Sequence, residues 1–86
     1  MQTIWKYELD ITDKQTISVP KGGKFLSAQM QGAQLCIWAQ VDPKAEKIPR
    51  DIAIVGTGNA VWCHDYEYLS TFQVHGAALI FHVFTR

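Results

Sequence analysis

The clearest structural pattern in this chain is KFLSAQMQ-GA-QLCIWAQV, residues 24–41. Gly32-Ala33 lies at its centre, and glycine readily adopts the positive φ that a two-residue hairpin turn requires. With the turn at this point, three apolar pairs share one side of the hairpin: Met30 with Leu35, Ala28 with Ile37, and Leu26 with Ala39. A slip of one residue would mix apolar and polar side chains on both sides, so the pattern also predicts the register.

The other side of this hairpin carries aromatic and uncharged polar side chains. Its residues are Phe25, Ser27, Gln29 and Gln31 on the first strand and Gln34, Cys36, Trp38 and Gln40 on the second. Aromatic side chains with few charges are typical of protein-binding surfaces. We therefore expect a partner to contact Phe25, Gln29, Trp38 and Gln40. The alternative is that a loop or a second sheet covers Trp38.

Further short strands extend outward from this hairpin. Residues 3–11 alternate between apolar and charged side chains, as half-buried strands do. Strands are also expected at residues 15–19, 51–55, 68–75 and 78–84, with Gly76-Ala77 joining the last two. Because residues 78–84 are apolar on both sides at several positions, we expect that strand at the centre of a sheet.

Two stretches are expected to lie outside the strands. Residues 42–50 are polar and contain Pro43 and Pro49, which predicts a surface loop. Residues 60–67 could form an irregular loop or one helical turn.

The whole chain, residues 1–86, is expected to form a single β domain. Apolar residues make up 48% of it, which is enough for a packed core. Glycine and proline divide the chain into short segments rich in β-branched and aromatic residues, and no helix of about ten residues is evident. The predicted class is all-β, as a small antiparallel sandwich or a partly open barrel of six to seven strands joined by tight hairpins.

Charge and hydropathy exclude several function classes. Eight Lys and Arg balance eight Asp and Glu, so the neutral chain has no strong field to draw it onto nucleic acid or an anionic membrane. The longest apolar runs, such as residues 77–81, are far shorter than the roughly 20 residues that span a bilayer. Two cysteines and no visible secretory signal favour a reducing compartment with both thiols free.

Residue types that bind metals or act in catalysis occur in the C-terminal half of the chain. Cys63-His64-Asp65, with His75 and His82, supplies the ligand types of zinc and the components of a Cys–His pair. The spacing argues against both sites. His75 and His82 would lie about 13 Å apart along the expected hairpin, and adjacent Cys63 and His64 would point to opposite sides of an extended chain. We therefore expect a non-enzymatic protein with no catalytic residues, no metal and no cofactor.

A glycine-rich turn leaves a second function open. Backbone amides of Gly56, Thr57, Gly58 and Asn59 could bind an anion, although the segment lacks the lysine of a P-loop and the third glycine of a dinucleotide fingerprint. The alternative function is thus a small-ligand sponge that binds a signalling nucleotide through this turn, and the other explanation is a turn that simply needs positive φ.

A second aromatic segment, residues 62–68, adds three residues to the expected partner contacts. They are Trp62, His64 and Tyr66.

Five short motifs occur in order along nearly the whole chain. They are Ile4-Trp5-Lys6-Tyr7, Ile37-Trp38-Ala39 followed by Val41-Asp42-Pro43, Gly56-Thr57-Gly58, Thr71-Phe72-Gln73 and Phe81-His82-Val83-Phe84. Together they resemble a family of small domains of about this length, encoded in bacteriophages and prophages and mostly of unknown function. The resemblance implies an accessory phage protein in the host bacterial cytoplasm.

Accessory phage proteins of this size often inhibit a host defence, as anti-CRISPRs do. The resemblance therefore implies a protein that binds and blocks a host bacterial protein, with anti-defence as the role. A homo-oligomer is a further expectation, because a small domain gains stability by pairing its exposed strand edges.

Overall fold

The protein is an antiparallel β-sandwich of seven strands in a computed structural model that describes residues 1–74, 76 and 78–86. The strands are β1 (Thr3–Leu9), β2 (Lys14–Pro20), β3 (Lys24–Gln31), β4 (Gln34–Val41), β5 (Lys47–Gly56), β6 (Glu67–Gln73) and β7 (Ile80–Thr85). Within the described ranges no helix is long and apolar enough to cross a membrane. The predicted all-β class is confirmed.

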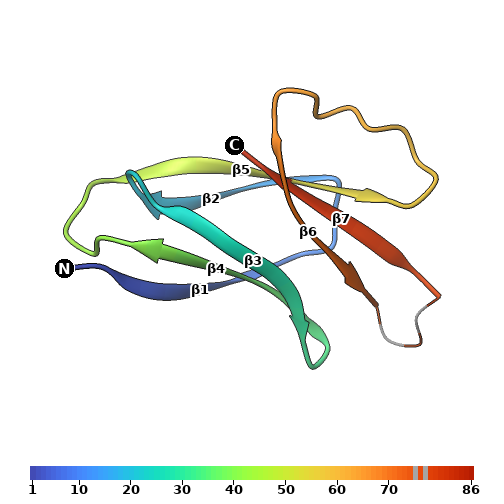
Figure 1. The fold of residues 1–86 in the computed structure, drawn as a ribbon, viewed down its shortest axis with the longest axis horizontal. Coiled ribbons are helices and arrows are strands. Elements are labelled where there is room, and N and C mark those ends of the chain that lie inside the picture. The colour runs from blue at the N-terminus through green and yellow to red at the C-terminus, as the bar shows by residue number, and fades with distance from the viewer. Residues whose placement is uncertain (75, 77) are drawn as a thin grey trace.

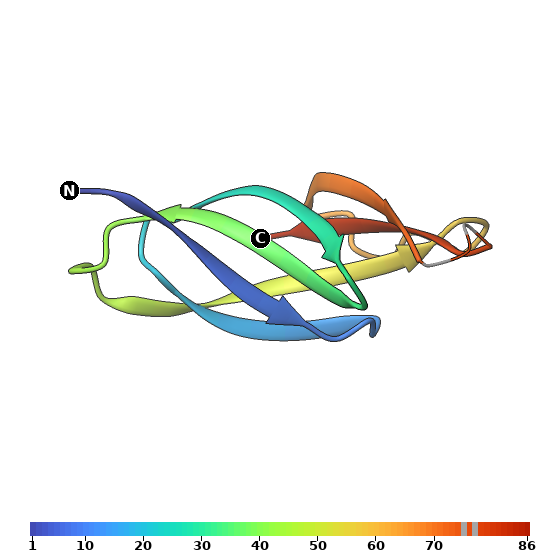
Figure 2. The ribbon, with the colours of Figure 1, turned by 90° about the horizontal axis from the view of Figure 1, so that it is seen from below.

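The strands form two sheets, which we call sheet A and sheet B. Sheet A has the order β1-β4-β3, and sheet B has the order β2-β5-β7-β6. In Figure 1, sheet A lies in front of β2 and β5, and Figure 2 shows the two layers from the side. The core between them joins Leu35 and Ile37 of sheet A to Ile52 and Val83 of sheet B, all at most 1% exposed. The side of each sheet that faces away from this core is its outer face.

The β3–β4 hairpin has the predicted turn, with Gly32 at φ +61°. Its predicted pairs Met30–Leu35 and Ala28–Ile37 are confirmed. The predicted pair of Leu26 with Ala39 is wrong, because a bulge shifts the register between Phe25 and Ser27.

The bulge exchanges the places of two side chains. Phe25 pairs with Ala39 and is 8% exposed in the core, whereas Leu26 is 40% exposed. A bulge sets two residues opposite one, so strict alternation fails there.

Two of the expected boundaries also need correction. β1 ends at Leu9, and Ile11, expected on its inner side, is 43% exposed in the turn to β2. The expected loop at residues 42–50 is shorter, because β5 begins at Lys47 and includes Pro49. Residues 47–50 pair with β2 only, so Pro49, which lacks an N–H on the open side of β5, removes no hydrogen bond from the sheet.

The β6–β7 hairpin confirms that the last strand is central, since β7 lies between β5 and β6. Thr71 pairs with His82 as predicted, and the register shifts between Tyr68 and Ser70. The expected strand end at His75, and Ala77 of the expected turn, lie outside the described residues.

The shift in β6 brings Ser70 to the neighbouring edge of sheet A. The Ser70 hydroxyl donates to the carbonyl oxygen of Ala28 (2.8 Å) and accepts from the amide of Ala28 (2.9 Å). One side chain thus satisfies both backbone groups of a fully buried residue where β3 and β6 have no backbone pairing. Ser70 therefore ties the two sheets together along this side.

Residues 57–66, between β5 and β6, form an irregular loop that packs on the outer face of sheet B. Cys63 (2% exposed) and Tyr66 (8%) cover Ala53 and Val55, with Phe84 at the margin. The open alternative for residues 60–67 is thereby decided in favour of a loop, with one turn from Cys63 to Tyr66. Cys36 and Cys63 are both buried free thiols.

Candidate functional site

Three of the expected partner contacts share the outer face of sheet A. Gln29 and Gln40 are exposed and Trp38 is half-buried. Their cross-strand partners place them together on one face: Gln29 pairs with Cys36, Ser27 with Trp38, and Lys24 with Gln40.

Phe25 does not belong to that face. Its ring lies in the core, and the guanidinium carbon of Arg50 lies 4.5 Å from the ring centroid. Arg50 is held there by donating to the carbonyl oxygens of Gly23 and Arg86, each at 2.9 Å. Phe25 is therefore a core residue that cannot present its ring to a partner as predicted.

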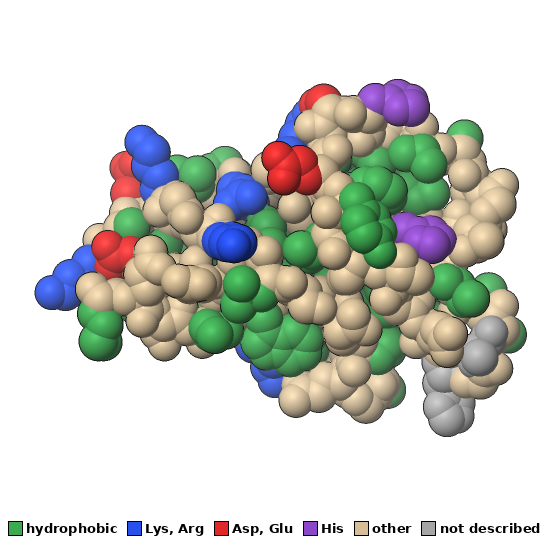
Figure 3. All heavy atoms as spheres, in the orientation of Figure 1, with side chains coloured by type: hydrophobic (Ala, Val, Ile, Leu, Met, Phe, Trp, Pro, Cys, Tyr) green, Lys and Arg blue, Asp and Glu red, His purple; other side chains and the backbone are tan. Residues whose placement is uncertain are grey.

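Sequence reasoning missed two apolar residues of the outer face. Ile4 on β1 is 57% exposed and Leu26 on β3 is 40% exposed. Ile4 could have been found, because in an alternating strand it lies on the same side as the charged Lys6 and Glu8 and opposite to the inward Trp5. Leu26 could not, because its position depends on the bulge. Figure 3 shows apolar side chains over this part of the molecule, with Lys and Arg side chains beside them.

The other three expected contacts lie on the loop over sheet B. Trp62 is 45% exposed and His64 is exposed, but Tyr66 is only 8% exposed. The Trp62 and Tyr66 rings meet edge to face with centroids 5.7 Å apart. The buried Tyr66 ring thus supports the exposed Trp62 ring. Trp62, His64 and Tyr66 form a group that is separate from the outer face of sheet A.

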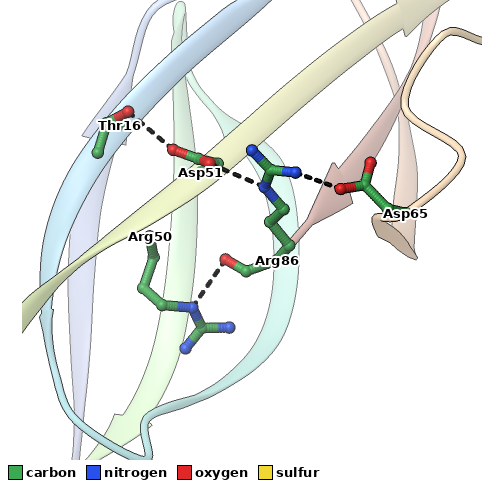
Figure 4. Close-up of polar contacts among 5 residues, drawn as sticks. All are labelled: Thr16, Arg50, Asp51, Asp65 and Arg86. Atoms are coloured by element: carbon green, nitrogen blue, oxygen red, sulfur yellow. Dashed lines mark hydrogen bonds and ion pairs between the residues drawn. The ribbon is translucent and has the colours of Figure 1, made fainter.

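An ionic latch holds this loop in place (Figure 4). The guanidinium of Arg86 binds Asp51 of β5 at 2.9 Å, also binds Asp65 of the loop, and lies 4.5 Å from the centroid of the Tyr66 ring. Thr16 of β2 donates to Asp51 at 2.9 Å. The hydrogen bond from Arg86, and then that from Thr16, lowers the pKa of Asp51 below its ordinary value.

This lowered pKa predicts a loss of stability in acid. A carboxyl group whose pKa is lower in the folded state stabilises the fold above about pH 4, and the contribution is lost as the pH falls through the folded pKa. We expect Asp51→Asn to be less stable than the wild type at pH 7, and the difference to shrink below about pH 4. Urea titrations from pH 7 to pH 2.5 measure it, with the exposed Glu46→Gln as control. A constant difference over this range would contradict the role of Asp51.

The turn expected to bind a ligand borders three open hollows, two of which are also lined by residues of β7. Asn59 N–H donates to the Gly56 carbonyl oxygen (3.0 Å), and Gly58 has φ +92°, so the turn does require glycine. One hollow of about 190 Å³ is lined by this turn, Val55, Val61, His82 and Phe84. A second, of about 470 Å³, lies between the turn and residues 78–81.

His82 is held at both ring nitrogens. Thr57 Oγ1 donates its single hydrogen to the Ile80 carbonyl oxygen (3.2 Å), so it accepts from His82 Nε2 (2.8 Å). In the neutral ring, Nδ1 then accepts from Thr71 Oγ1 (2.9 Å), and Thr71 accepts from the Tyr68 hydroxyl (2.7 Å). His82 would have to break one of these bonds to bind a metal or accept a proton from a substrate.

The residues considered for zinc or thiol chemistry are not gathered into one site within the described chain. No group of three His, Cys, Asp or Glu side chains lies close enough there to hold a metal ion. The Cys63 side chain points from the loop onto sheet B and is buried, while His64 of the same loop is exposed.

The comparison with family models matches residues 1–86 to a domain of unknown function, DUF7352. The chain belongs to this family. No curated protein and no solved structure matches it. The DUF7352 assignment agrees with the resemblance to small domains of unknown function, and it brings no residue roles. The candidate site of this DUF7352 domain is therefore defined by its own geometry alone.

Proposed function

We propose that this DUF7352 domain is a non-enzymatic binding protein that docks on a protein of its bacterial host and blocks it. One observation carries the proposal. Residues 57–66 cover the outer face of sheet B at Ala53 and Val55, whereas no described segment crosses the outer face of sheet A (Figure 1). That open face presents Ile4 and Leu26 together with the half-buried Trp38.

The polar residues of this face favour a protein partner. Gln29 and Gln40 offer amide donors and acceptors, and burying an amide in an interface is less unfavourable than burying a charge. The face also carries three charged residues, Lys6, Glu8 and Lys24, so its apolar and aromatic side chains lie among amides and charges of both signs. Interfaces commonly combine an apolar and aromatic centre with a polar rim of this kind. Trp62 and His64 form a separate exposed group, which could provide a second contact.

The resemblance to phage-encoded domains supports the cellular setting. We propose that the protein acts in the host bacterial cytoplasm as an anti-defence inhibitor, in the manner of an anti-CRISPR. Occlusion of a surface requires no catalytic group, which agrees with a His82 that is engaged at both nitrogens.

Arginine substitutions test the docking face. We expect Gln29→Arg and Gln40→Arg, which place a charge on exposed positions, to weaken partner binding about tenfold or more. Gln73→Arg makes the same change at an exposed position of β6 in sheet B and should bind as the wild type does. Trp38→Ala and Trp62→Ala show which of the two groups the partner contacts, because Trp38 lies on sheet A and Trp62 on the loop. Circular dichroism checks that both variants fold.

Two measurements report on partner binding and its effect in the host. One is capture of host proteins with mass spectrometry, and the other is plaque formation on a defended host that expresses each variant. A host protein that copurifies with the wild type and Gln73→Arg but not with Gln29→Arg or Gln40→Arg, together with restored plaque formation, supports the proposal. If the sheet A variants capture the partner as well as the wild type, the docking face is wrong.

The second candidate function is ligand binding beside the Gly56–Asn59 turn. The hollow next to His82 and Phe84 favours it, because the rings of these two residues could stack on a heterocycle. Among the described residues that line the three hollows, none is Lys or Arg, so a nucleotide phosphate would rely on backbone amides alone. This ranks a signalling nucleotide below a protein partner.

A thermal-shift screen with cyclic nucleotides separates the two functions. A ligand that binds only the folded state raises the melting temperature, and the increase grows with the logarithm of the ligand concentration once this exceeds Kd. A shift of several degrees that is absent in Asn59→Ala would support the sponge, and no shift with any nucleotide favours the protein partner.

A further inference from the structure

β1 is an unpaired edge of sheet A. It pairs with β4 on one side only, and in Figure 2 no described segment passes in front of it. The strand has seven residues and contains no proline. Open edges of this kind form backbone hydrogen bonds with another strand when one of matching pattern is present.

The backbone groups that face the open edge can be assigned. In a two-residue hairpin the closing pair, here Gln31 and Gln34, exchanges backbone hydrogen bonds. The backbone N–H and C=O groups of even-numbered β4 residues therefore point toward β3, and those of odd-numbered β4 residues point toward β1. In agreement, the amide and carbonyl of Ala28 point away from β4, toward Ser70. Odd-numbered residues of β1 therefore face β4, which leaves the N–H and C=O groups of Ile4, Lys6 and Glu8 at the open edge.

The charged side chains of β1 are complementary to those of a second β1 strand that runs antiparallel to it. When two β1 strands lie antiparallel with Tyr7 opposite Tyr7, Lys6 of each copy lies opposite Glu8 of the other. Both residues are exposed on the outer face, so opposite charges meet in two places. Each Lys6–Glu8 pair also exchanges two backbone hydrogen bonds.

The neighbouring registers lack this match. Centring the pair on Lys6 sets two lysines against each other, which is unfavourable. Centring it on Trp5 sets Lys6 opposite Ile4 and leaves Glu8 beyond the ladder. A shift by one residue would turn inner side chains outward.

We propose that two copies of this chain pair through β1, antiparallel and with the two-fold axis at Tyr7. The three strands of sheet A from each copy then form one continuous six-stranded sheet. Trp5 and Tyr7, half-buried at the edge, lie opposite Leu9 and Tyr7 of the second copy.

The inference does not rest on the proposed function. It extends the outer face of sheet A across both copies, so a host target would meet two docking faces side by side.

Charge reversal tests the pairing, measured by sedimentation equilibrium from 1 µM to 1 mM protein in low salt. We expect Glu8→Lys to weaken the dimer about tenfold or more, because it sets lysines opposite each other at two places. Lys6→Glu should do the same. The double variant Lys6→Glu/Glu8→Lys restores the opposite pairs and should dimerise as the wild type does. Lys24→Glu, the same charge change on exposed β3, should have little effect.

Mixing gives a sharper result. The Lys6→Glu and Glu8→Lys chains are each self-repelling but complementary to one another, so an equimolar mixture should form heterodimers. All these positions are exposed, and urea titration checks that each variant folds. A wild type that stays monomeric at 1 mM overturns the proposal. So does a dimer that Glu8→Lys leaves unchanged, or a folded double variant and mixture that both fail to associate.

Discussion

Replacing Phe25 with alanine is expected to lower the free energy of unfolding by about 3–5 kcal/mol. The ring is 8% exposed, packs in the core between the sheets and carries the Arg50 guanidinium over one face. A domain of this length has a total stability of about 4–13 kcal/mol, so this loss is a large part of it. Leu26→Ala, one residue along, is expected to change it by only about 0.5 kcal/mol, since Leu26 is 40% exposed.

This pair of variants also tests the bulge in β3. Strict alternation places Leu26 opposite Ala39 and makes it the core residue, whereas the observed register places Phe25 there. Urea denaturation of the two variants under identical conditions decides between the registers. A larger loss for Leu26→Ala than for Phe25→Ala would show that the alternating register is correct.

Replacing Ser70 with alanine is expected to cost about 2 kcal/mol or more. The substitution removes the one hydroxyl that satisfies both the amide and the carbonyl of Ala28, which is fully buried. A buried backbone group without a partner costs about 1–3 kcal/mol, and here two are affected. The contact between β3 and β6 should loosen, and the Ala28 amide should exchange with solvent faster.

The matched control for Ser70→Ala is Ser18→Ala, the same change at an exposed position of β2. Ser70→Thr keeps a hydroxyl and should recover part of the stability. Urea titration gives the free energies, and amide exchange by NMR reports on Ala28. Equal stability of Ser70→Ala and Ser18→Ala, with the Ala28 amide still protected, would show that the serine bridge is not needed.

Local pattern was enough to predict the β3–β4 hairpin near its turn. Gly32 provides the positive φ, and the apolar pairs close to the turn leave one register without mixed faces. The prediction failed at Leu26, about six residues from the turn, because a bulge adds one residue to one strand and reverses the alternation beyond it. The second shift, between Tyr68 and Ser70, has the same origin. Nothing in the residue types marks either position.

The candidate contacts were predicted less well than the strands. Gln29, Trp38 and Gln40 do share an exposed face: Gln29 and Trp38 lie where the register was right, and Gln40 lies on β4, the strand that has no bulge. Tyr66 and Cys63 are buried because the loop folds back onto Ala53 and Val55. That fold-back depends on Arg86, which binds Asp51 and Asp65 from distant parts of the chain.

By itself, the order of apolar and polar residues determined that this chain forms short antiparallel strands, where its tightest turns lie and which side of most strands is buried. These features follow from contacts between residues near each other in the chain, where a period of two and a glycine suffice. Only the tertiary structure decided how the strands divide between two sheets, where bulges shift the register and which outer face is covered. Those outcomes depend on contacts such as Ser70 with Ala28 and Arg86 with Asp65, which form only when remote segments meet.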